Sequence, residues 1–403
     1  MKIKFINHAS MLVKVKDYFF LTDPWYLSNA FGGWVQNPHP NYSDVKSLIE
    51  IDKNKLFVVI SHGHDDHCDD NFIKNYLSEA QSIIPSYKSK GFFRRVNSLF
   101  QKKPIEVDYL DSFEIENITI NAFIDESGDE DRRNGQSNND AIMTISSDEE
   151  FLIHANDNWY DLPNEVFERL KKLKGKKYTY YFSQNGVADC WPIKYDNYDP
   201  ITIQNIYEKR CNHYLNSFKK NISKINSDMA FSYANQSSIV GTKKIFNEMN
   251  ISTPQNIMQK IINNDDDVVQ LQPGMLIEDR KLNISDSKDI SLFDYCMVKL
   301  ESKLNHWLKE CNVKTNLKFS SDENQRLESD NSVIYYAPKN VWQEIFNGNL
   351  NLEAISIGGV GFIKKNPNLN ISDVHHLMSK YCYIIQSMVK KNGIINFIRG
   401  KAK

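Results

Sequence analysis

The segment Ser61-His-Gly-His-Asp-Asp-His-Cys-Asp-Asp70 carries more information than any other part of this sequence. It follows the apolar run Leu56-Phe-Val-Val-Ile60, which is typical of a buried strand. Three histidines and one aspartate of the segment are possible metal ligands: His62, His64, Asp66 and His67. We therefore expect these side chains on the loop that leaves the carboxyl end of a strand.

A divalent metal explains this cluster better than a structural role, because imidazole and carboxylate groups are normal metal ligands. His62 and His64 alternate in an extended segment, so both can point to the same side and reach one ion. Asp66 and His67 diverge once the chain turns into the following helix, so they can serve a second ion. The alternative is a polar loop that is rich in histidine by chance.

The composition is that of an ordinary globular protein, with 41% hydrophobic and 25% charged residues. With 403 residues, the chain is long enough for two domains. A net charge of −2 gives no reason to expect nucleic acid as a partner. No apolar run approaches the ~20 residues of a membrane-spanning helix. The six cysteines include no C-x-x-C pair, so we expect no disulfide framework and a cytoplasmic location.

The order of the expected elements indicates an α/β fold, an αββα sandwich with two sheets inside and helices outside. We expect strands at 2–6, 10–16, 18–22, 118–123, 141–145, 151–154 and 178–183. Helices are expected at 71–79, 162–174, 201–226 and 238–249. The irregular, aromatic segment 25–42 is interpreted as a lid or a substrate wall.

The character of the sequence changes after about residue 280, where 281–289 is polar and resembles a linker. The rest of the chain is expected to hold helices near 290–311, 340–347 and 371–390, with strands near 314–320 and 332–337. We therefore predict a metal-binding catalytic domain at 1–280 and a smaller α+β domain at 281–403. The second domain would serve as a cap or substrate domain.

The H-x-H-x-D-H motif after a strand resembles the metallo-β-lactamase superfamily. Further segments are similar to the CMP-N-acetylneuraminate hydroxylase group of that superfamily: Asn7–Ser10, Leu21–Trp25, Ser183–Pro192, Leu271–Gly274 and Trp342–Leu350. More distantly, the chain is similar to N-acyl-phosphatidylethanolamine phospholipase D and ascorbate-6-phosphate lactonase, which are hydrolases. The resemblance implies a site for two metal ions.

The resemblance also implies further ligands. Asp157 stands where the superfamily usually places its bridging aspartate, although it could instead cap the following helix. No histidine occurs between His67 and His154, so Glu126 or its neighbour Asp125 is the natural substitute, unless this acidic loop is simply solvated. The last superfamily histidine is missing from 232–236, and His213 is a weak substitute on the preceding helix.

Exchanging imidazoles for carboxylates makes the site harder and more anionic, which shifts the preference from zinc towards iron or manganese. We expect two divalent metal ions, with iron preferred and zinc or manganese possible. The sialic acid hydroxylase group also carries a Rieske cluster, but this chain has no C-x-x-H element, so none is expected. An oxidising enzyme would then need a separate electron donor or take the electrons from its substrate.

Two functions follow from this interpretation. The first is a non-haem diiron oxygenase that acts on a nucleotide sugar or a similar small metabolite. The second is a hydrolase of a phosphoester, amide or lactone, in which a metal-bound hydroxide attacks and Asp65 or Asp66 orients it. Asp66, His67 and Asp157 are the expected catalytic residues in either case. A third possibility is an inactive scaffold.

Several residues are expected around the metals. His8 could point into the site or be a hydrogen-bonded structural histidine, and Asp23 would accept a hydrogen bond from a metal-bound histidine. Gln184 could bind a polar substrate. His154 could line the pocket, although we interpret it as a packed strand residue. Trp25, Trp34 and Trp191 could stack on a base or sugar, or anchor loops.

Overall fold

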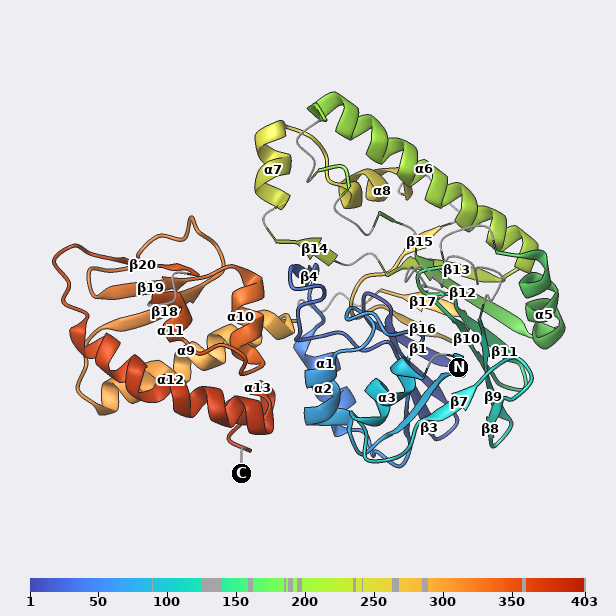
Figure 1. The fold of residues 1–403 in the computed structure, drawn as a ribbon, viewed down its shortest axis with the longest axis horizontal. Coiled ribbons are helices and arrows are strands. Elements are labelled where there is room, and N and C mark those ends of the chain that lie inside the picture. The colour runs from blue at the N-terminus through green and yellow to red at the C-terminus, as the bar shows by residue number, and fades with distance from the viewer. Residues whose placement is uncertain are drawn as a thin grey trace.

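The structure is a computed structural model in which residues 1–88, 90–124, 140–158, 162–184, 186–187, 191–193, 198–234, 237–240, 242–262, 268–284, 289–356 and 360–401 are described. Figure 1 shows two stacked sheets, with the C-terminal residues gathered to one side of them.

The first sheet has eight strands, and antiparallel pairs at one end give way to parallel pairs at the other. In spatial order its strands are β17 (Lys281–Asn283), β16 (Leu276–Glu278), β1 (Lys2–Asn7), β2 (Ser10–Val15), β3 (Tyr18–Thr22), β5 (Leu56–Val59), β6 (Gln81–Pro85) and β7 (Ile105–Val107). The parallel register of β3 and β5 places the residues that follow both strands at the same edge.

The second sheet has seven strands, of which β11, β12 and β13 run parallel. Its spatial order is β15 (Val269–Gln270), β13 (Met229–Tyr233), β12 (Tyr178–Gln184), β11 (Glu150–His154), β10 (Ile142–Ser146), β9 (Ile118–Phe123) and β8 (Phe113–Ile115). Alternate side chains of the two sheets, among them Phe20, Leu152 and Phe182, form one core between them.

Helices cover the outer faces, so the predicted αββα sandwich is confirmed (Figure 1). The first sheet packs against α1 (Tyr42–Glu50), α2 (Asp70–Phe72), the π-helix η1 (Ile73–Leu77) and α3 (Gly91–Asn97). The second packs against α5 (Asn164–Lys174), α6 (Pro200–Ile225), α7 (Thr242–Met249) and α8 (Pro254–Ile262). None of the helices in the described ranges has the length and apolar character needed to cross a bilayer.

The C-terminal part forms a small sheet of β18 (Asn316–Ser320), β19 (Ser332–Tyr336) and β20 (Phe362–Lys365). Around it lie α9 (Leu292–Glu310), α10 (Lys339–Phe346), α11 (Glu353–Ser356), α12 (Ser372–Asn392) and α13 (Ile394–Ile398). Its apolar side chains join those on the outer face of the first sheet in one continuous cluster. The prediction of a separate domain from residue 281 therefore stays a prediction.

One sequence interpretation needs correction, and another segment contains a strand that the sequence does not predict. The polar stretch from Lys281 begins with β17, because the backbone of these residues pairs with β16 at the sheet edge. The irregular segment 25–42 contains β4 (Trp34–Gln36), which pairs with β14 (Ser237–Ile239). Both pairings join short strands that lack a long alternating pattern, so the sequence gives little sign of them.

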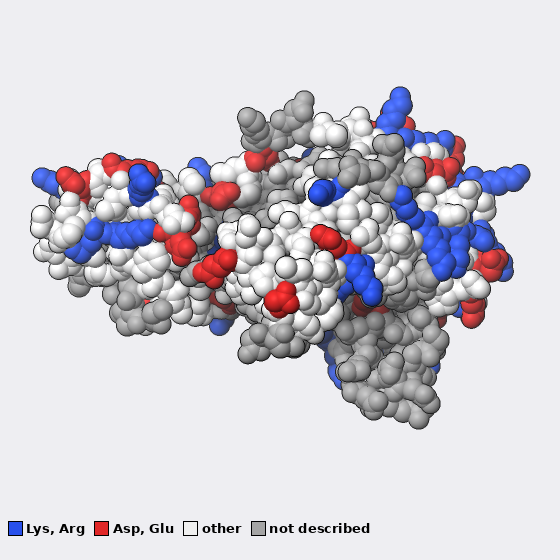
Figure 2. Space-filling view, turned by 90° about the horizontal axis from the view of Figure 1, so that it is seen from above, with Lys and Arg blue, Asp and Glu red and all other residues white. Residues whose placement is uncertain are grey.

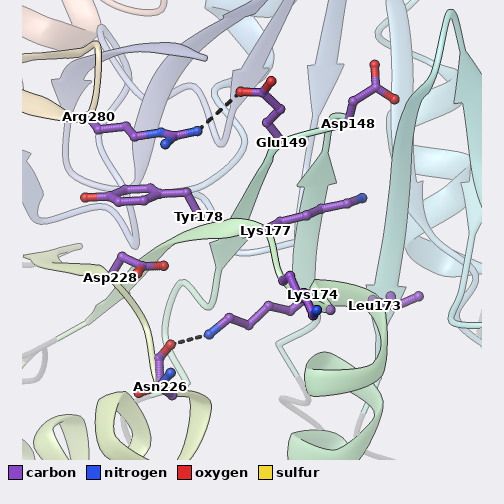
Figure 3. A pocket seen from close by; sticks show the side chains of 11 residues that line it. Asp148, Glu149, Leu173, Lys174, Lys177, Tyr178, Asn226, Asp228 and Arg280 are labelled. Carbon is purple, nitrogen blue, oxygen red and sulfur yellow. Dashed lines mark hydrogen bonds and ion pairs between the residues drawn. The ribbon is translucent and has the colours of Figure 1, made fainter.

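A hollow of about 740 Å³ lies where the strands of the second sheet begin (Figure 3). Lys174, Lys177, Asp228 and Arg280 line it, and Lys174 donates to the backbone carbonyl of Ile225 at 3.3 Å. The predicted site residues follow the opposite ends of these strands. The hollow is therefore separate from the predicted metal site.

On the molecular face in Figure 2, basic and acidic side chains are interspersed.

The core between the sheets gives a stability prediction. Leu152→Ala removes a fully buried side chain from this core and should lower the free energy of unfolding by about 2–5 kcal/mol, measured by urea denaturation. Leu110→Ala is the matched control, because Leu110 is 89% exposed and its loss should change that energy by less than about 0.5 kcal/mol. Equal effects of the two substitutions would contradict the described packing.

Candidate metal centre

The predicted histidine loop lies at the carboxyl edge of both sheets. Ser61 and His62 follow β5, while Asp23 follows β3, the strand parallel to it. His154 ends β11 in the second sheet, and Asp157 lies three residues beyond it. The edge of the sandwich thus brings together side chains that are far apart in sequence.

One group of possible ligands is fully buried and consists of His8, Asp66 and His67. One ligand atom from each lies within 4.8 Å of the others. The distance from His8 Nε2 to Asp66 Oδ2 is 3.4 Å, and that from His67 Nε2 to the same oxygen is 3.9 Å. His8 comes from the turn between β1 and β2 and adopts a left-handed backbone conformation.

A second group consists of His62, His64 and Asp157, and its ligand atoms also lie within 4.8 Å of one another. His62 Nε2 and His64 Nδ1 are 3.0 Å apart. Two nitrogens that share one ion, each at about 2.1 Å from it, lie about 3.0–3.4 Å apart for bond angles between 90° and the tetrahedral angle. Asp157 Oδ1 is 3.3 Å from His67 Nε2, so this carboxylate also contacts the first group.

Unpaired buried atoms in both groups fit a metal. His8 Nδ1 and Nε2, Asp66 Oδ1, His67 Nε2 and Asp157 Oδ1 are buried without a hydrogen-bond partner in the structure. Leaving a buried polar atom unpaired usually costs about 1–3 kcal/mol. Coordination of a cation would compensate for several of these costs at once. The donor set therefore fits the metal pair that the sequence implies.

Asp23 orients the histidines of this edge. Its Oδ2 accepts hydrogen bonds from His67 Nδ1 at 2.9 Å and from His154 Nε2 at 2.8 Å. Ser61 donates to the same carboxylate through its backbone N–H at 2.8 Å and its hydroxyl at 2.6 Å. Burial raises the pKa of Asp23, but the two imidazoles lower it more strongly, so it lies well below its usual range. Asp23 thus stays ionised and leaves His67 Nε2 facing the site.

Electrostatics favour a cation at the centre. Burial and the neighbouring His67 lower the pKa of His62 to about 3, which keeps this imidazole in the neutral form that binds metals. Burial lowers the pKa of His67, but the carboxylates of Asp157, Asp66 and Asp23 raise it by a larger amount. The pKa of His67 therefore lies well above its ordinary value. The carboxylates that favour a protonated imidazole would equally favour a metal ion.

Arg95 of α3 holds the histidine loop from outside. It donates to the backbone carbonyls of Gly63 at 2.5 Å and Cys68 at 3.2 Å. It also donates to the carboxylates of Asp65 and Asp70, both at 3.1 Å. These contacts fix both sides of the turn that carries His64 and Asp66.

The other predicted residues lie in different places. Glu126 and Asp125 lie outside the described residues. Gln184 is buried, and its amide donates to the Ala234 carbonyl at 3.4 Å. His154 is buried, with its Nδ1 hydrogen-bonded to the Tyr233 hydroxyl, as expected of a packed strand residue. His213 is exposed on α6, and Cys68 belongs to neither group.

Two features of the site do not follow from the sequence. His8 is expected around the metals, whereas its ring lies among the possible ligands in the structure. His8 lies beside the segment that lacks the expected histidine, since its carbonyl accepts from Ala234 N at 2.9 Å.

Asp140 Oδ1 is 3.5 Å from His62 Nε2. Burial and the Asp157 carboxylate raise the pKa of Asp140 well above normal. The sequence offered one sign that Asp140 could reach the site, namely its place two residues before β10.

A family model described as "Beta-lactamase superfamily domain" matches residues 2–173, the part that holds all members of both groups. The match covers less than half of the chain, so these residues are similar to that family. The αββα sandwich described above is consistent with the metallo-β-lactamase fold. Comparison with curated proteins finds no match.

Solved structures similar to this chain include hydrolases and a hydroxylase. A possible metal-dependent hydrolase from Veillonella parvula is 13% identical, with 69% of this chain and 98% of that chain covered and a TM-score of 0.45. An isothiocyanate hydrolase from Delia radicum gut bacteria is 14% identical, with 69% and 99% covered and a TM-score of 0.45. CmlA, a diiron β-hydroxylase from Streptomyces venezuelae, is 13% identical, with 70% and 54% covered and a TM-score of 0.42.

Asp23→Asn gives a test of the orienting carboxylate. The variant keeps the shape of the side chain but loses one acceptor oxygen and the negative charge that fix His67. We expect metal affinity to fall by about 10- to 100-fold, measured by competition with a chelator. Asp111→Asn, an aspartate in the exposed turn before β8, is the control. Unchanged affinity in the Asp23 variant would show that this carboxylate does not orient the histidines.

Proposed function

We propose that this chain is a dinuclear metalloenzyme in which each ion is held by two histidines and one carboxylate. The observation that carries the proposal is the composition of the two groups, His8–Asp66–His67 and His62–His64–Asp157. Asp157 would bridge the two ions, because its carboxylate belongs to the second group and contacts His67 of the first. Asp140 would supply a further oxygen beside His62.

Iron is the metal we propose. A set of two histidines and one carboxylate with open positions is characteristic of non-haem iron oxygenases. Asp66, Asp140 and Asp157 give the centre three carboxylates, which makes it harder and more anionic than a site built of imidazoles. The irons would bind and reduce dioxygen, with electrons from a separate donor.

The chain itself would orient the substrate and exclude water. Buried His67 and His8 close the inner side of the centre, and Trp25, which is fully buried, packs its ring edge-on 5.1 Å from His8. A nucleotide sugar or a similar small metabolite remains the proposed substrate, and it rests on the sequence resemblance alone. Gln184 is turned to the Ala234 carbonyl, which makes it a weaker candidate for substrate contact.

A metal-dependent hydrolase is the second candidate. The observation that favours it is the close contact of the two groups through His67 and Asp157, at 3.3 Å. Two ions about 3.5–4 Å apart can activate a water between them for attack on an ester, amide or lactone. Asp66 would then orient that water, and zinc or manganese would serve in place of iron.

Metal stoichiometry tests the two ligand groups. His8→Ala and His64→Ala should each lose about one of two metal equivalents, because each removes one ligand from a different group. His213→Ala, on the exposed face of α6, should keep both. The measurement is elemental mass spectrometry of protein purified without oxygen. Two retained equivalents in the His64 variant would remove the central part of the proposal.

The identity of the metal separates the two functions. Two irons per chain with a coupled diiron signal in Mössbauer or EPR spectra, and oxygen uptake that requires an added reductant, would support the oxygenase. Two zinc ions, with hydrolysis of ester or lactone substrates in the absence of oxygen, would support the hydrolase instead. No bound metal after reconstitution would contradict both functions.

A further inference from the structure

The two groups differ in their exposure to solvent. His8, Asp66 and His67 are all buried, whereas His64 and Asp157 of the second group are half-buried. A substrate must therefore approach from the side of His64 and Asp157. Side chains on that side are the ones that can select it.

Phe31 stands on that side. Its ring lies 5.7 Å from the His64 ring at an interplanar angle of 73°, and 5.3 Å from the Trp34 ring at 79°. Phe31 is 52% exposed, although a phenyl ring gains free energy from burial. Exposed Phe31 and half-buried Trp34, beside a possible metal ligand, are well placed to pack against an incoming molecule.

The backbone of Phe31 is also unusual. Its φ angle is 49°, in the left-handed region that non-glycine residues seldom adopt. A Cβ atom on the next residues, Gly32 and Gly33, would meet no atom within 4 Å, so open space borders the tip of this loop. The loop therefore keeps a large apolar side chain in a strained conformation, next to open space and next to His64. Such strain is typical of functional positions.

The C-terminal part holds this loop in place. Asn29 donates to the Asn340 carbonyl at 2.9 Å and to Glu344 Oε1 at 2.7 Å, both on α10. Gln343 of α10 is buried and donates to Gln36 at the end of β4. The loop between Asn29 and Gln36 is thus anchored to α10 on both sides of Phe31.

The residues directly before this loop are held by Asp69, which lies two residues after His67. Asp69 accepts hydrogen bonds from the backbone N–H groups of Tyr26 at 3.1 Å, Leu27 at 2.8 Å and Ser28 at 3.0 Å. Asp69 also caps α2, directly after the histidine loop. Phe31 is therefore fixed relative to His64 by contacts on both sides.

We propose that Phe31 and Trp34 form an aromatic wall that selects a substrate with a planar ring next to its reacting group, and that α10 positions this wall. The proposal rests on the proposed metal centre, which would bind the reacting group. The ring of the substrate would pack against Phe31, while its polar reacting group lies at His64 and Asp157.

Two metal-binding probes that differ by one ring test the wall. Acetohydroxamate and benzohydroxamate carry the same metal-binding group, and the second adds a phenyl ring. The dissociation constants for the metal-loaded protein are measured by calorimetry. We expect benzohydroxamate to bind at least about fivefold more tightly, the gain typical of one aromatic contact. Phe31→Ala should reduce this ratio to about one, while Leu110→Ala should keep it.

Phe31→Gly separates the role in binding from a role in folding. Glycine adopts positive φ without strain, so this variant should unfold at the same or a higher temperature than the parent. It should nevertheless lose the preference for benzohydroxamate. A lower unfolding temperature with an unchanged preference would show that Phe31 is structural, and would overturn the proposal.

Glu344 tests the part played by α10. Glu344→Ala removes one of the two acceptors that α10 offers to Asn29, and it should lower the ratio of the two dissociation constants with both metal equivalents retained. Glu344→Gln keeps an acceptor oxygen and should preserve the ratio. An unchanged ratio in the alanine variant would overturn the positioning role of α10.

The same samples distinguish failure of the wall from failure of the metal centre. Two metal equivalents with equal affinity for both probes would overturn the aromatic wall and leave the metal centre standing. Protein that takes up no metal and binds neither probe would overturn the proposed function, and the wall with it.

Discussion

The buried carboxylate of Asp23 connects the two sheets at the edge where the possible ligands gather. It follows a strand of the first sheet and accepts hydrogen bonds from Ser61 and His67, which follow the neighbouring strand. It also accepts one from His154, at the end of a strand in the second sheet. A buried charge is stable only with such partners, so the position of the sheets and the orientation of the histidines depend on each other.

The proposed metals would in turn relieve the crowding of charge around this carboxylate. Asp66, Asp140 and Asp157 lie close enough together that their charges oppose ionisation of Asp140. Hydrogen bonds from the protein do not satisfy all of these groups, as the unpaired atoms of His8, Asp66 and Asp157 show. The polar groups at this edge of the sandwich would be fully satisfied only with bound metal ions. Such locally unfavourable arrangements are common at functional sites.

Most of the sandwich could be predicted because its strands alternate and its helices carry clear end signals. Strand β9 and helices α5 and α6 lie within two residues of their expected positions. His62, His64, Asp66 and His67 could be found because they are neighbours in sequence. His8 and Asp140 could not be assigned, since each reaches the site from a separate turn and only the folded chain brings them together. The pairing of β4 with β14 was missed for the same reason.

The difference in burial between the two ligand groups bears on how the centre would be assembled. Within the described part of the chain, an ion held by His8, Asp66 and His67 would be surrounded by buried side chains. It would exchange slowly and would best be acquired while the chain is folding, as a structural component. An ion at His62, His64 and Asp157 would exchange with the medium in the folded protein. The two positions would then fill at different times. The metals that are available at each time would decide which two ions the folded protein contains.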